Sequence, residues 1–331
     1  MMDYRQAENR HEYFDALYTM NLKHGVMPGL VYLYMPAMAN HFGWDDEDKL
    51  WFAFLNGMTQ NPITSLRLFT QLPLVPPAGA GLKQFTDWFN ENWETLQFDT
   101  DRRYQKRDTI EAIKTYARLV EEHGTQKAML TGKTYQELWN LVRNRYYSFG
   151  RLSSFSYLEY VYLNGFGSDC DDLLFGDKSG SKSHRNGMMF LLGQDQFIWD
   201  KRANNSFDGA YPNFPALVDW LSVAAKTYLK VYSANNPTIN NVGNFTLESN
   251  LCTFKNHFFG RRYPGVYADM AWERILWAES HNIDCSLFKD MRAGLLPDWL
   301  RAETENVQMT INQKAAMFAS TGYPYRGDNF L

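Results

Sequence analysis

The stretch from Arg145 to Gly193 reads RYYSFGRLSSFSYLEYVYLNGFGSDCDDLLFGDKSGSKSHRNGMMFLLG. Apolar residues recur at helical spacing on both sides of a polar centre, at Leu152, Phe155, Leu158 and Tyr162 before it and at Met188, Met189 and Leu192 after it. The stretch therefore predicts two helices joined by a polar hairpin. We expect the other helices of the chain to be arranged around this pair.

The hairpin is acidic where it begins and basic where it ends. Its charged residues are Asp169, Asp171 and Asp172, then Lys182, His184 and Arg185. Gly176 and Gly180 allow tight turns, and Ser183 is placed to cap the second helix. Because a helix N-terminus carries about half a positive charge, the loop is expected to attract a phosphate. A solvated loop whose charges only cap and pair is the competing interpretation.

The hairpin is not a nucleotide-binding P-loop. GDKSGSKS is one residue out of step with G-x-x-x-x-G-K-S, and no buried strand precedes it. The chain also lacks a metalloprotease pair of histidines, a G-x-S-x-G elbow and a G-x-G-x-x-G loop, which excludes the commoner hydrolases and oxidoreductases. The three aspartates are left with three roles: binding Mg²⁺ beside a phosphate, accepting a proton, or capping a turn.

Composition indicates a large helical protein with a substantial core. The chain has 331 residues, 45% of them hydrophobic and 16% aromatic, so some aromatic rings are expected to stack on a ligand while most fill helix interfaces. The formal net charge of -4 gives no overall attraction to nucleic acid, so a polyanion requires a local basic patch. Cys170, Cys252 and Cys285 are too few and too far apart for a disulfide framework or a structural zinc site. No signal peptide or membrane span is expected.

Helical periodicity and capping signals recur along the chain, whereas alternating strand patterns do not. Helices are expected to begin at Asp45, Pro62, Asp108, Thr134 and Phe214, and a last one to cover 298–319. The fold class is therefore all-α, a multi-helix globular domain of about twelve to fifteen helices. We predict a single domain over 1–331, with the polar loop 200–212 as the place where it would divide.

Two basic clusters stand out. Lys182, His184 and Arg185 follow the hairpin, Lys255, Arg261 and Arg262 lie at the end of a later helix, and Arg151 adds another cation. Arginine pairs with phosphate oxygens through parallel charge-assisted hydrogen bonds of ~1.5 to 3 kcal/mol each, so converging donors would hold a pyrophosphate.

Four segments carry a family resemblance: RYYSFGR, DCDDLLFGDKSGSKSHRNGMMFLLG, LCTFKNHFFGRRYPG and NGMTQNPITSLRLF. They resemble the phage-encoded helical α-glutamyl/putrescinyl thymine pyrophosphorylases, also described as amino acid:DNA transferases. The resemblance spans most of the chain and implies a fold like that of helix-hairpin-helix DNA glycosylases. The glycosylase hairpin L-P-G-φ-G is only echoed here by Leu163-Asn164-Gly165-Phe166-Gly167.

The resemblance implies a transferase of thymine hypermodification in the cytoplasm of an infected bacterium. The amine of an amino acid or polyamine would displace pyrophosphate from 5-pyrophosphoryloxymethyl-uracil in double-stranded phage DNA, after the base is flipped out of the duplex. The resemblance implies no definite cofactor, and Mg²⁺ beside the phosphates is the one candidate. The candidate catalytic residues are Asp171, Asp172, Lys182, His184 and Arg185. The candidate substrate-binding residues are Arg151, Tyr147, Asn186, Lys255, Arg261 and Arg262, with Tyr146 and Phe149 as further stacking rings.

Two other functions remain open at this point. A DNA glycosylase would use Asp171 or Asp172 to activate water and would leave abasic sites. A non-catalytic phage DNA-binding protein would use the basic clusters for backbone phosphates, with a steep salt dependence.

Overall fold

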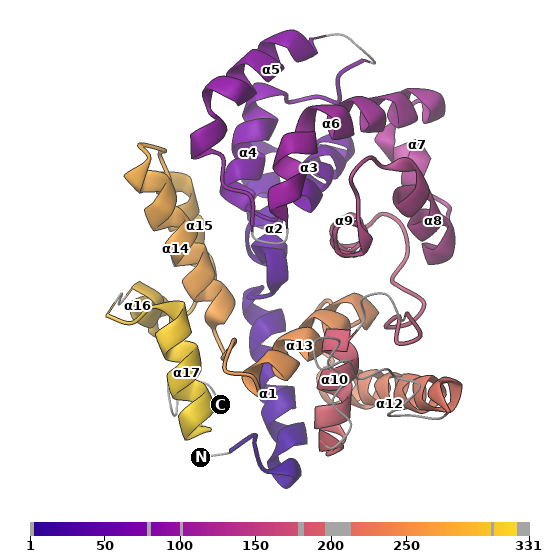
Figure 1. The fold of residues 1–331 in the computed structure, drawn as a ribbon, viewed down its shortest axis with the longest axis vertical. Helices are drawn as coiled ribbons and strands as arrows, with labels where there is room; N and C mark the ends of the chain where they lie inside the picture. Colours follow the sequence, from indigo (N-terminus) through magenta and orange to yellow (C-terminus); the bar gives the residue numbers. More distant parts are fainter. Residues whose placement is uncertain are drawn as a thin grey trace. The chain divides into compact units, whose positions relative to one another are not determined.

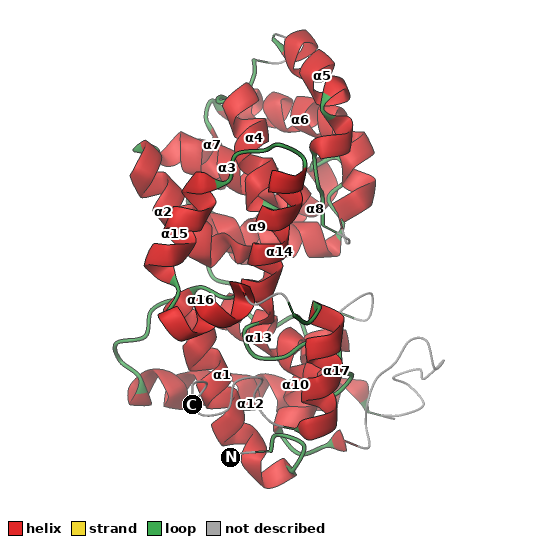
Figure 2. Cartoon of the chain, turned by 90° about the vertical axis from the view of Figure 1, so that its left-hand side faces the viewer, coloured by secondary structure: helices red, strands yellow, loops and turns green. Residues whose placement is uncertain are grey.

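The computed structural model describes residues 3–77, 81–99, 102–177, 182–195, 213–305 and 308–322. Within these ranges every regular element is a helix (Figures 1 and 2). The all-α prediction is therefore confirmed. None of the helices in these ranges combines the length and the apolar character needed to cross a bilayer.

The helices keep the labels of Figure 1. They are α1 Arg10–His24, α2 Val31–Phe42, α3 Asp46–Thr59, α4 Pro62–Gln71, α5 Leu82–Glu91, α6 Arg103–His123, α7 Gln126–Leu130, α8 Tyr135–Arg145, α9 Arg151–Leu163, α10 Lys182–Leu191, α12 Phe214–Asn235, α13 Asn244–His257, α14 Val266–Ser280, α15 Ser286–Leu295, α16 Asp298–Glu305 and α17 Ile311–Thr321. Short 3-10 turns cover Ala7–Asn9, Pro28–Leu30 and Trp93–Thr95.

The predicted caps at Asp45 and Thr134 are confirmed. Asp45 accepts a hydrogen bond from the Asp48 backbone N–H at 2.9 Å, while the Asp48 side chain accepts one from Asp45. Thr134 and Glu137 form the same reciprocal pair at the start of α8. These side chains satisfy backbone donors that the first turn of a helix leaves open, so the acidic group at Asp45 acts as a cap.

Three expected helix limits are wrong. α6 begins at Arg103, so Asp108 lies inside it, because the polar residues before Asp108 are good helix formers and continue the turn. The segment 298–319 forms two helices, since Thr310 and Gln313 form a capping box that starts α17. α10 begins at Lys182, which places Ser183 within the helix.

The chain forms two compact units. Unit 1 comprises Met1–Met27, Cys170–Met270 and Leu296–Leu331, and unit 2 comprises Pro28–Asp169 and Ala271–Leu295. The loop 200–212, proposed as the point of division, lies outside the described residues.

The core of unit 2 is aromatic and centres on α3, which packs against α4, α6, α7 and α9. The Phe54 ring stacks on Tyr116 at 3.9 Å between centroids and on Phe149 at 5.4 Å. Tyr146 joins them, and its hydroxyl lies 3.2 Å from that of Tyr157. Tyr146 and Phe149, predicted as stacking rings for a flipped base, are thus buried in a helix interface.

The core of unit 1 is built where α13 meets α10, α1 and α17. Phe190 of α10 stacks on Phe258 at 4.0 Å, and Tyr4 stacks on Phe318 of α17 at 5.0 Å. α13 is buried on almost every side although it carries polar residues such as Thr246, Glu248 and Asn250. A helix buried all round with polar side chains needs partners for them inside the protein.

Candidate functional site

The crossing of α10 and α13 depends on one glycine. A Cβ atom on Gly187 would lie 2.1 Å from the carbonyl oxygen of Leu251 and 2.7 Å from its carbonyl carbon. No other residue allows the two backbones to approach so closely. The crossing therefore sets His184, one turn before Gly187, against the side chains of α13.

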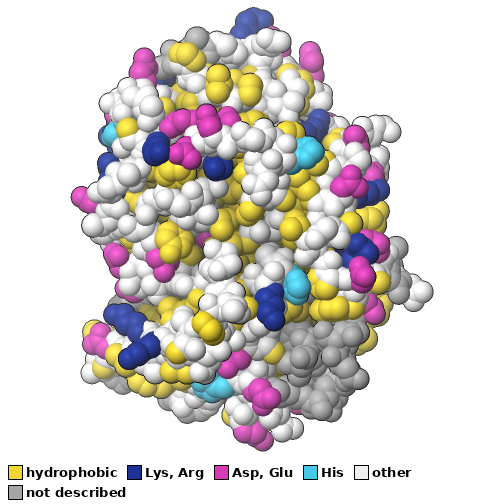
Figure 3. Space-filling view, turned by 180° about the vertical axis from the view of Figure 1, so that it is seen from behind, with side chains coloured by type: hydrophobic (Ala, Val, Ile, Leu, Met, Phe, Trp, Pro, Cys, Tyr) yellow, Lys and Arg dark blue, Asp and Glu magenta, His cyan; other side chains and the backbone are white. Residues whose placement is uncertain are grey.

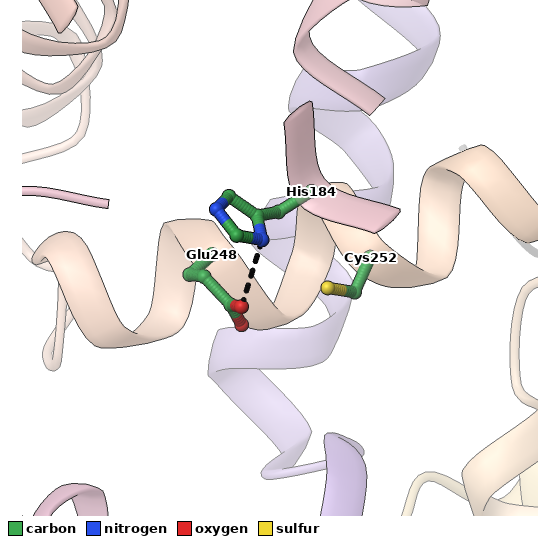
Figure 4. A group of neighbouring side chains, drawn as sticks. All are labelled: His184, Glu248 and Cys252. Atoms are coloured by element: carbon green, nitrogen blue, oxygen red, sulfur yellow. Dashed lines mark ion pairs between the residues drawn. The ribbon is translucent and has the colours of Figure 1, made fainter. Parts of the chain in front are cut away.

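His184 faces a carboxylate and a thiol from α13 (Figure 4). Its Nδ1 lies 3.0 Å from Oε1 of Glu248, and both side chains are buried. Glu248 and Cys252 are four residues apart and so share one face of the helix. One donor atom from each of the three residues lies within 4.8 Å of the others.

The geometry gives the imidazole a defined orientation. A carboxylate can only accept a hydrogen bond, so Glu248 favours the tautomer with hydrogen on Nδ1 and a free lone pair on Nε2. Nε2 is shielded from solvent and has no hydrogen-bond partner within the described parts of the chain. The Phe175 ring stacks on the imidazole at 5.3 Å between centroids, which limits its rotation. Such a carboxylate–histidine pair is suited to accept a proton at Nε2.

The same three residues offer one nitrogen, one oxygen and one sulfur donor, a set that suits zinc and similar metals. Magnesium prefers oxygen ligands, so this set does not fit the predicted Mg²⁺. Of the three aspartates proposed for it, Asp169 is half-buried, whereas Asp171 and Asp172 are exposed. Asp172 accepts a hydrogen bond from the Leu174 backbone N–H at 2.6 Å. Asp172 thus stabilises a turn around Leu174, whose φ of 54° is left-handed.

Arg185 is buried and points toward the loop before α10. Its Nε donates to the carbonyl oxygen of Phe175 at 2.9 Å, and its Nη2 donates to the carbonyl oxygen of Asp177 at 2.8 Å. The guanidinium also lies 5.3 Å from the centroid of the Phe214 ring. In this structure Arg185 holds the end of the hairpin, and its predicted contact with substrate stays a prediction.

The other predicted residues around the hairpin are placed less fully. Lys182 begins α10, but its side chain lies outside the description, as do residues 178–181. Asn186 is 1% exposed and therefore belongs to the interior of unit 1. Direct contact of Asn186 with a substrate stays a prediction.

The second basic cluster lies at the end of α13. The Nζ atom of Lys255 lies 5.1 Å from the centroid of the Phe259 ring. The Arg261 side chain is exposed, and Nη1 of Arg262 donates to the Arg261 carbonyl oxygen at 2.9 Å. Cations there also complement the negative end of the helix. Burial and then the Arg262 charge lower the pKa of His257, the last residue of α13, to about 3.

Tyr147 and Arg151 belong to unit 2. The Tyr147 ring is 46% exposed, whereas Arg151 is half-buried at the start of α9. Tyr147 remains available for stacking, unlike its neighbours Tyr146 and Phe149. That these residues meet the same substrate as those of unit 1 stays a prediction.

Sequence reasoning missed Glu248 and Cys252. The apolar spacing of Leu247, Leu251 and Phe254 indicates a helix, but it does not show that Glu248 is buried. A signal was nevertheless present, since Gly187 within a helical pattern marks a close backbone approach. The partner of that approach is a long-range contact, which periodicity does not reveal.

Comparison with known proteins gives one family and one relative. A family model described as amino acid:DNA transferase matches residues 31–263, a range that contains both α10 and α13. The serinyltransferase of Salmonella phage ViI is 28% identical over 299 residues, which cover 84% of this chain and 71% of the relative. No solved structure matches.

Proposed function

We propose that this chain, which belongs to the amino acid:DNA transferase family, joins the amine of an amino acid to a modified thymine in phage DNA with loss of pyrophosphate. Amino acid transfer to DNA is the activity named for the family. The displacement chemistry and the residues that perform it are the parts we add.

The proposed substrate is 5-pyrophosphoryloxymethyl-uracil in DNA. The incoming amino acid carries an ammonium group at neutral pH, which has no lone pair and cannot attack. Loss of one proton yields the amine, its lone pair forms a C–N bond to the methylene carbon, and the C–O bond breaks with its electron pair leaving on pyrophosphate. The resulting secondary ammonium then releases a second proton to water.

The observation that carries this proposal is the pairing of His184 with Glu248. The ammonium proton needs an acceptor, and Nε2 of His184 is a nitrogen lone pair held in place by a carboxylate on the opposite ring nitrogen. Once protonated, the imidazolium is stabilised by the Glu248 charge 3.0 Å away. General bases of this kind contribute about 10² to 10⁴ in rate.

The leaving group needs positive charge as negative charge grows on the bridging oxygen. Lys182 is the first residue of α10, and Arg261 and Arg262 follow the end of α13 in the same unit. We assign pyrophosphate binding to these residues. The remaining steps are extrusion of the base from the duplex and its stacking, for which the exposed Tyr147 is the candidate.

A purely DNA-binding protein is less well supported. On the face drawn in Figure 3, Lys and Arg side chains lie singly or in small groups among acidic ones. The net charge of -4 and the description of the matching family as a transferase both weigh against a protein that only binds backbone phosphates. A glycosylase is less well supported because the matching family is described as a transferase, Asp172 already holds a turn and Asp171 is exposed. The proposed setting is the cytoplasm of the infected host, where phage DNA is modified.

The test supplies the protein with duplex DNA carrying the pyrophosphorylated base and with serine, glycine, glutamate or putrescine. Nucleosides from the digested DNA are identified by mass spectrometry, and pyrophosphate is measured separately. We expect an amine adduct and one pyrophosphate per adduct. Abasic sites would establish a glycosylase, and DNA binding without any adduct or pyrophosphate would establish a binding protein.

A further inference from the structure

Helix α12 of unit 1 is buried along one side only. Leu217, Leu221 and Ala225 lie on that side and are buried, and α12 packs on α10 (Figure 1). The hydroxyl of Tyr232, another buried residue of α12, lies 2.6 Å from that of Thr19 in α1. This side of α12 therefore belongs to the core of unit 1, and the opposite side faces outward.

The outward side of α12 carries a continuous apolar stripe. It is formed by exposed residues spaced three or four apart, which are Ala216, Trp220, Val223, Thr227, Val231 and Ala234. Trp220, Val223 and Val231 are 44%, 63% and 53% exposed, and the stripe contains no charged residue. The outer face of a surface helix normally carries charged residues, so an apolar stripe in this position indicates a contact surface.

The charged residues of α12 all lie along one edge of this stripe. They are Asp219 in the N-terminal half of the helix and Lys226 and Lys230 in the C-terminal half, and all three are exposed. Because an α-helix turns by about 100° per residue, these positions fall on the same side of the stripe. Lys226 and Lys230 are four residues apart, so their charges repel each other. An acidic residue from outside the helix would be stabilised beside them.

We propose that the stripe is a dimer interface, in which α12 packs antiparallel on the α12 helix of a second copy of this chain. In an antiparallel pair each edge of one helix faces the same edge of the other, so Asp219 of one copy meets Lys230 of the second copy. A parallel pair would place the charged edge against an edge without charges. The order of charges along α12 therefore selects the antiparallel arrangement, and the two-fold axis forms each ion pair twice.

A second copy fits this stripe better than nucleic acid does. The stripe offers no cation to phosphates, and Asp219 at its edge would repel them. A helix with an acidic half and a basic half complements itself when it is reversed, which is the condition of a two-fold dimer. Because each copy contributes a single helix, the contact is small among protein interfaces, and we expect the dimer to dissociate on dilution.

Sedimentation velocity of the full chain over a series of micromolar concentrations tests the interface. We expect monomers at the low end and dimers at the high end. Val223→Asp should weaken the dimer by at least about 100-fold, because each dimer would bury two unpaired carboxylates. The Tm of this variant should match wild type, since Val223 is 63% exposed. The matched control is Leu276→Asp on α14, where the side chain is 39% exposed and lies outside the stripe, and it should dimerise like wild type.

Charge exchange tests the orientation of the two helices. Asp219→Lys and Lys230→Asp should each weaken self-association by about tenfold, because like charges then face each other across the axis. An equal mixture of the two variants should associate as wild type does, since every facing pair is again opposite in sign.

The possible results are decisive and do not depend on the proposed function. Monomers at every concentration, or a dimer that Val223→Asp leaves intact, would overturn the interface. A mixture of Asp219→Lys and Lys230→Asp that associates no better than either variant alone would overturn the antiparallel pairing. A monomeric protein in which Val223→Asp weakens DNA binding would assign the stripe to DNA instead.

Discussion

The α-carbon of Gly187 faces the backbone of Leu251 so closely that a Cβ atom would lie 2.1 Å from the Leu251 carbonyl oxygen. Gly187→Ala must therefore push α10 and α13 apart or distort one of them. We expect a loss of at least about 1–3 kcal/mol of stability, the usual cost of overpacking, because the obstacle is backbone and cannot rotate away. Thermal unfolding monitored by circular dichroism measures the change.

The control for that substitution is Gly294→Ala. Gly294 lies near the end of α15, is exposed, and a Cβ there meets nothing within 4 Å. Replacing a helical glycine with alanine typically gains about 0.5–1 kcal/mol. If Gly187→Ala is as stable as wild type while Gly294→Ala is stabilised, the backbones of α10 and α13 must lie farther apart than these distances indicate.

Glu248→Gln tests the proton acceptor. The amide keeps the shape of the side chain but can donate to Nδ1 of His184, which would move the ring hydrogen to Nε2 and remove the free lone pair. We expect turnover to fall by about 100-fold with DNA binding unchanged. Single-turnover rates at saturating DNA and amine are the readout, and a rate equal to wild type would exclude the pair as the base.

Cys252→Ser separates a proton acceptor from a metal site. The thiol completes the three-residue donor set but takes no part in the proposed proton transfer. We therefore expect normal turnover in Cys252→Ser and in wild-type protein treated with a chelator. Loss of activity in both, with a stoichiometric metal found by elemental analysis of the untreated protein, would assign the three residues to a metal ion instead.

Some of this organisation could be predicted from the sequence. Helix positions follow from local spacing and caps, so the all-α class, the cap at Asp45 and the capping box at Thr134 are confirmed. The family resemblance is confirmed by the family model. His184 was selected from the sequence for its place beside a loop, and its catalytic role stays a prediction. Its partner Glu248 lies 64 residues farther along the chain, and only the packing of α10 on α13 brings the two side chains together.

The sequence showed which residues are charged, but it did not show which of them are buried. Arg185 was expected to face an anion, yet its guanidinium donates to carbonyl oxygens inside unit 1. Arg274 was not selected, because it stands in the apolar run AWERILW and resembles an exposed residue of a packed helix. Whether an arginine is buried depends on neighbours from distant segments, here Asp99, which local sequence does not specify.

Arg185→Lys tests the structural role of the guanidinium. A lysine keeps the charge but cannot donate to the Phe175 and Asp177 carbonyls in the same forked geometry. Because a buried acceptor left without a partner costs about 1–3 kcal/mol, we expect a lower Tm. We also expect faster cleavage by proteases within the segment 171–177, which Arg185 holds in place. Full stability of Arg185→Lys together with slow pyrophosphate release would instead assign Arg185 to the substrate.

The last prediction concerns His257 and acid stability. Burial, and then the charge of Arg262, lower the pKa of His257 from 6.5 to about 3 in the folded protein, so the ring is neutral there while the unfolded chain binds a proton below pH 6.5. The unfolded state then holds more protons, and stability is lost as pH falls from 6.5 toward 3, by up to about 1.4 kcal/mol per pH unit.

His257→Gln removes this contribution. The free energy of unfolding of the variant should therefore depend less steeply on pH than that of wild type across pH 4 to 6, whatever the absolute stability of the variant. Urea titrations at several pH values measure both slopes. Parallel slopes would mean that His257 is protonated in the folded protein, and would contradict its burial beside Tyr13.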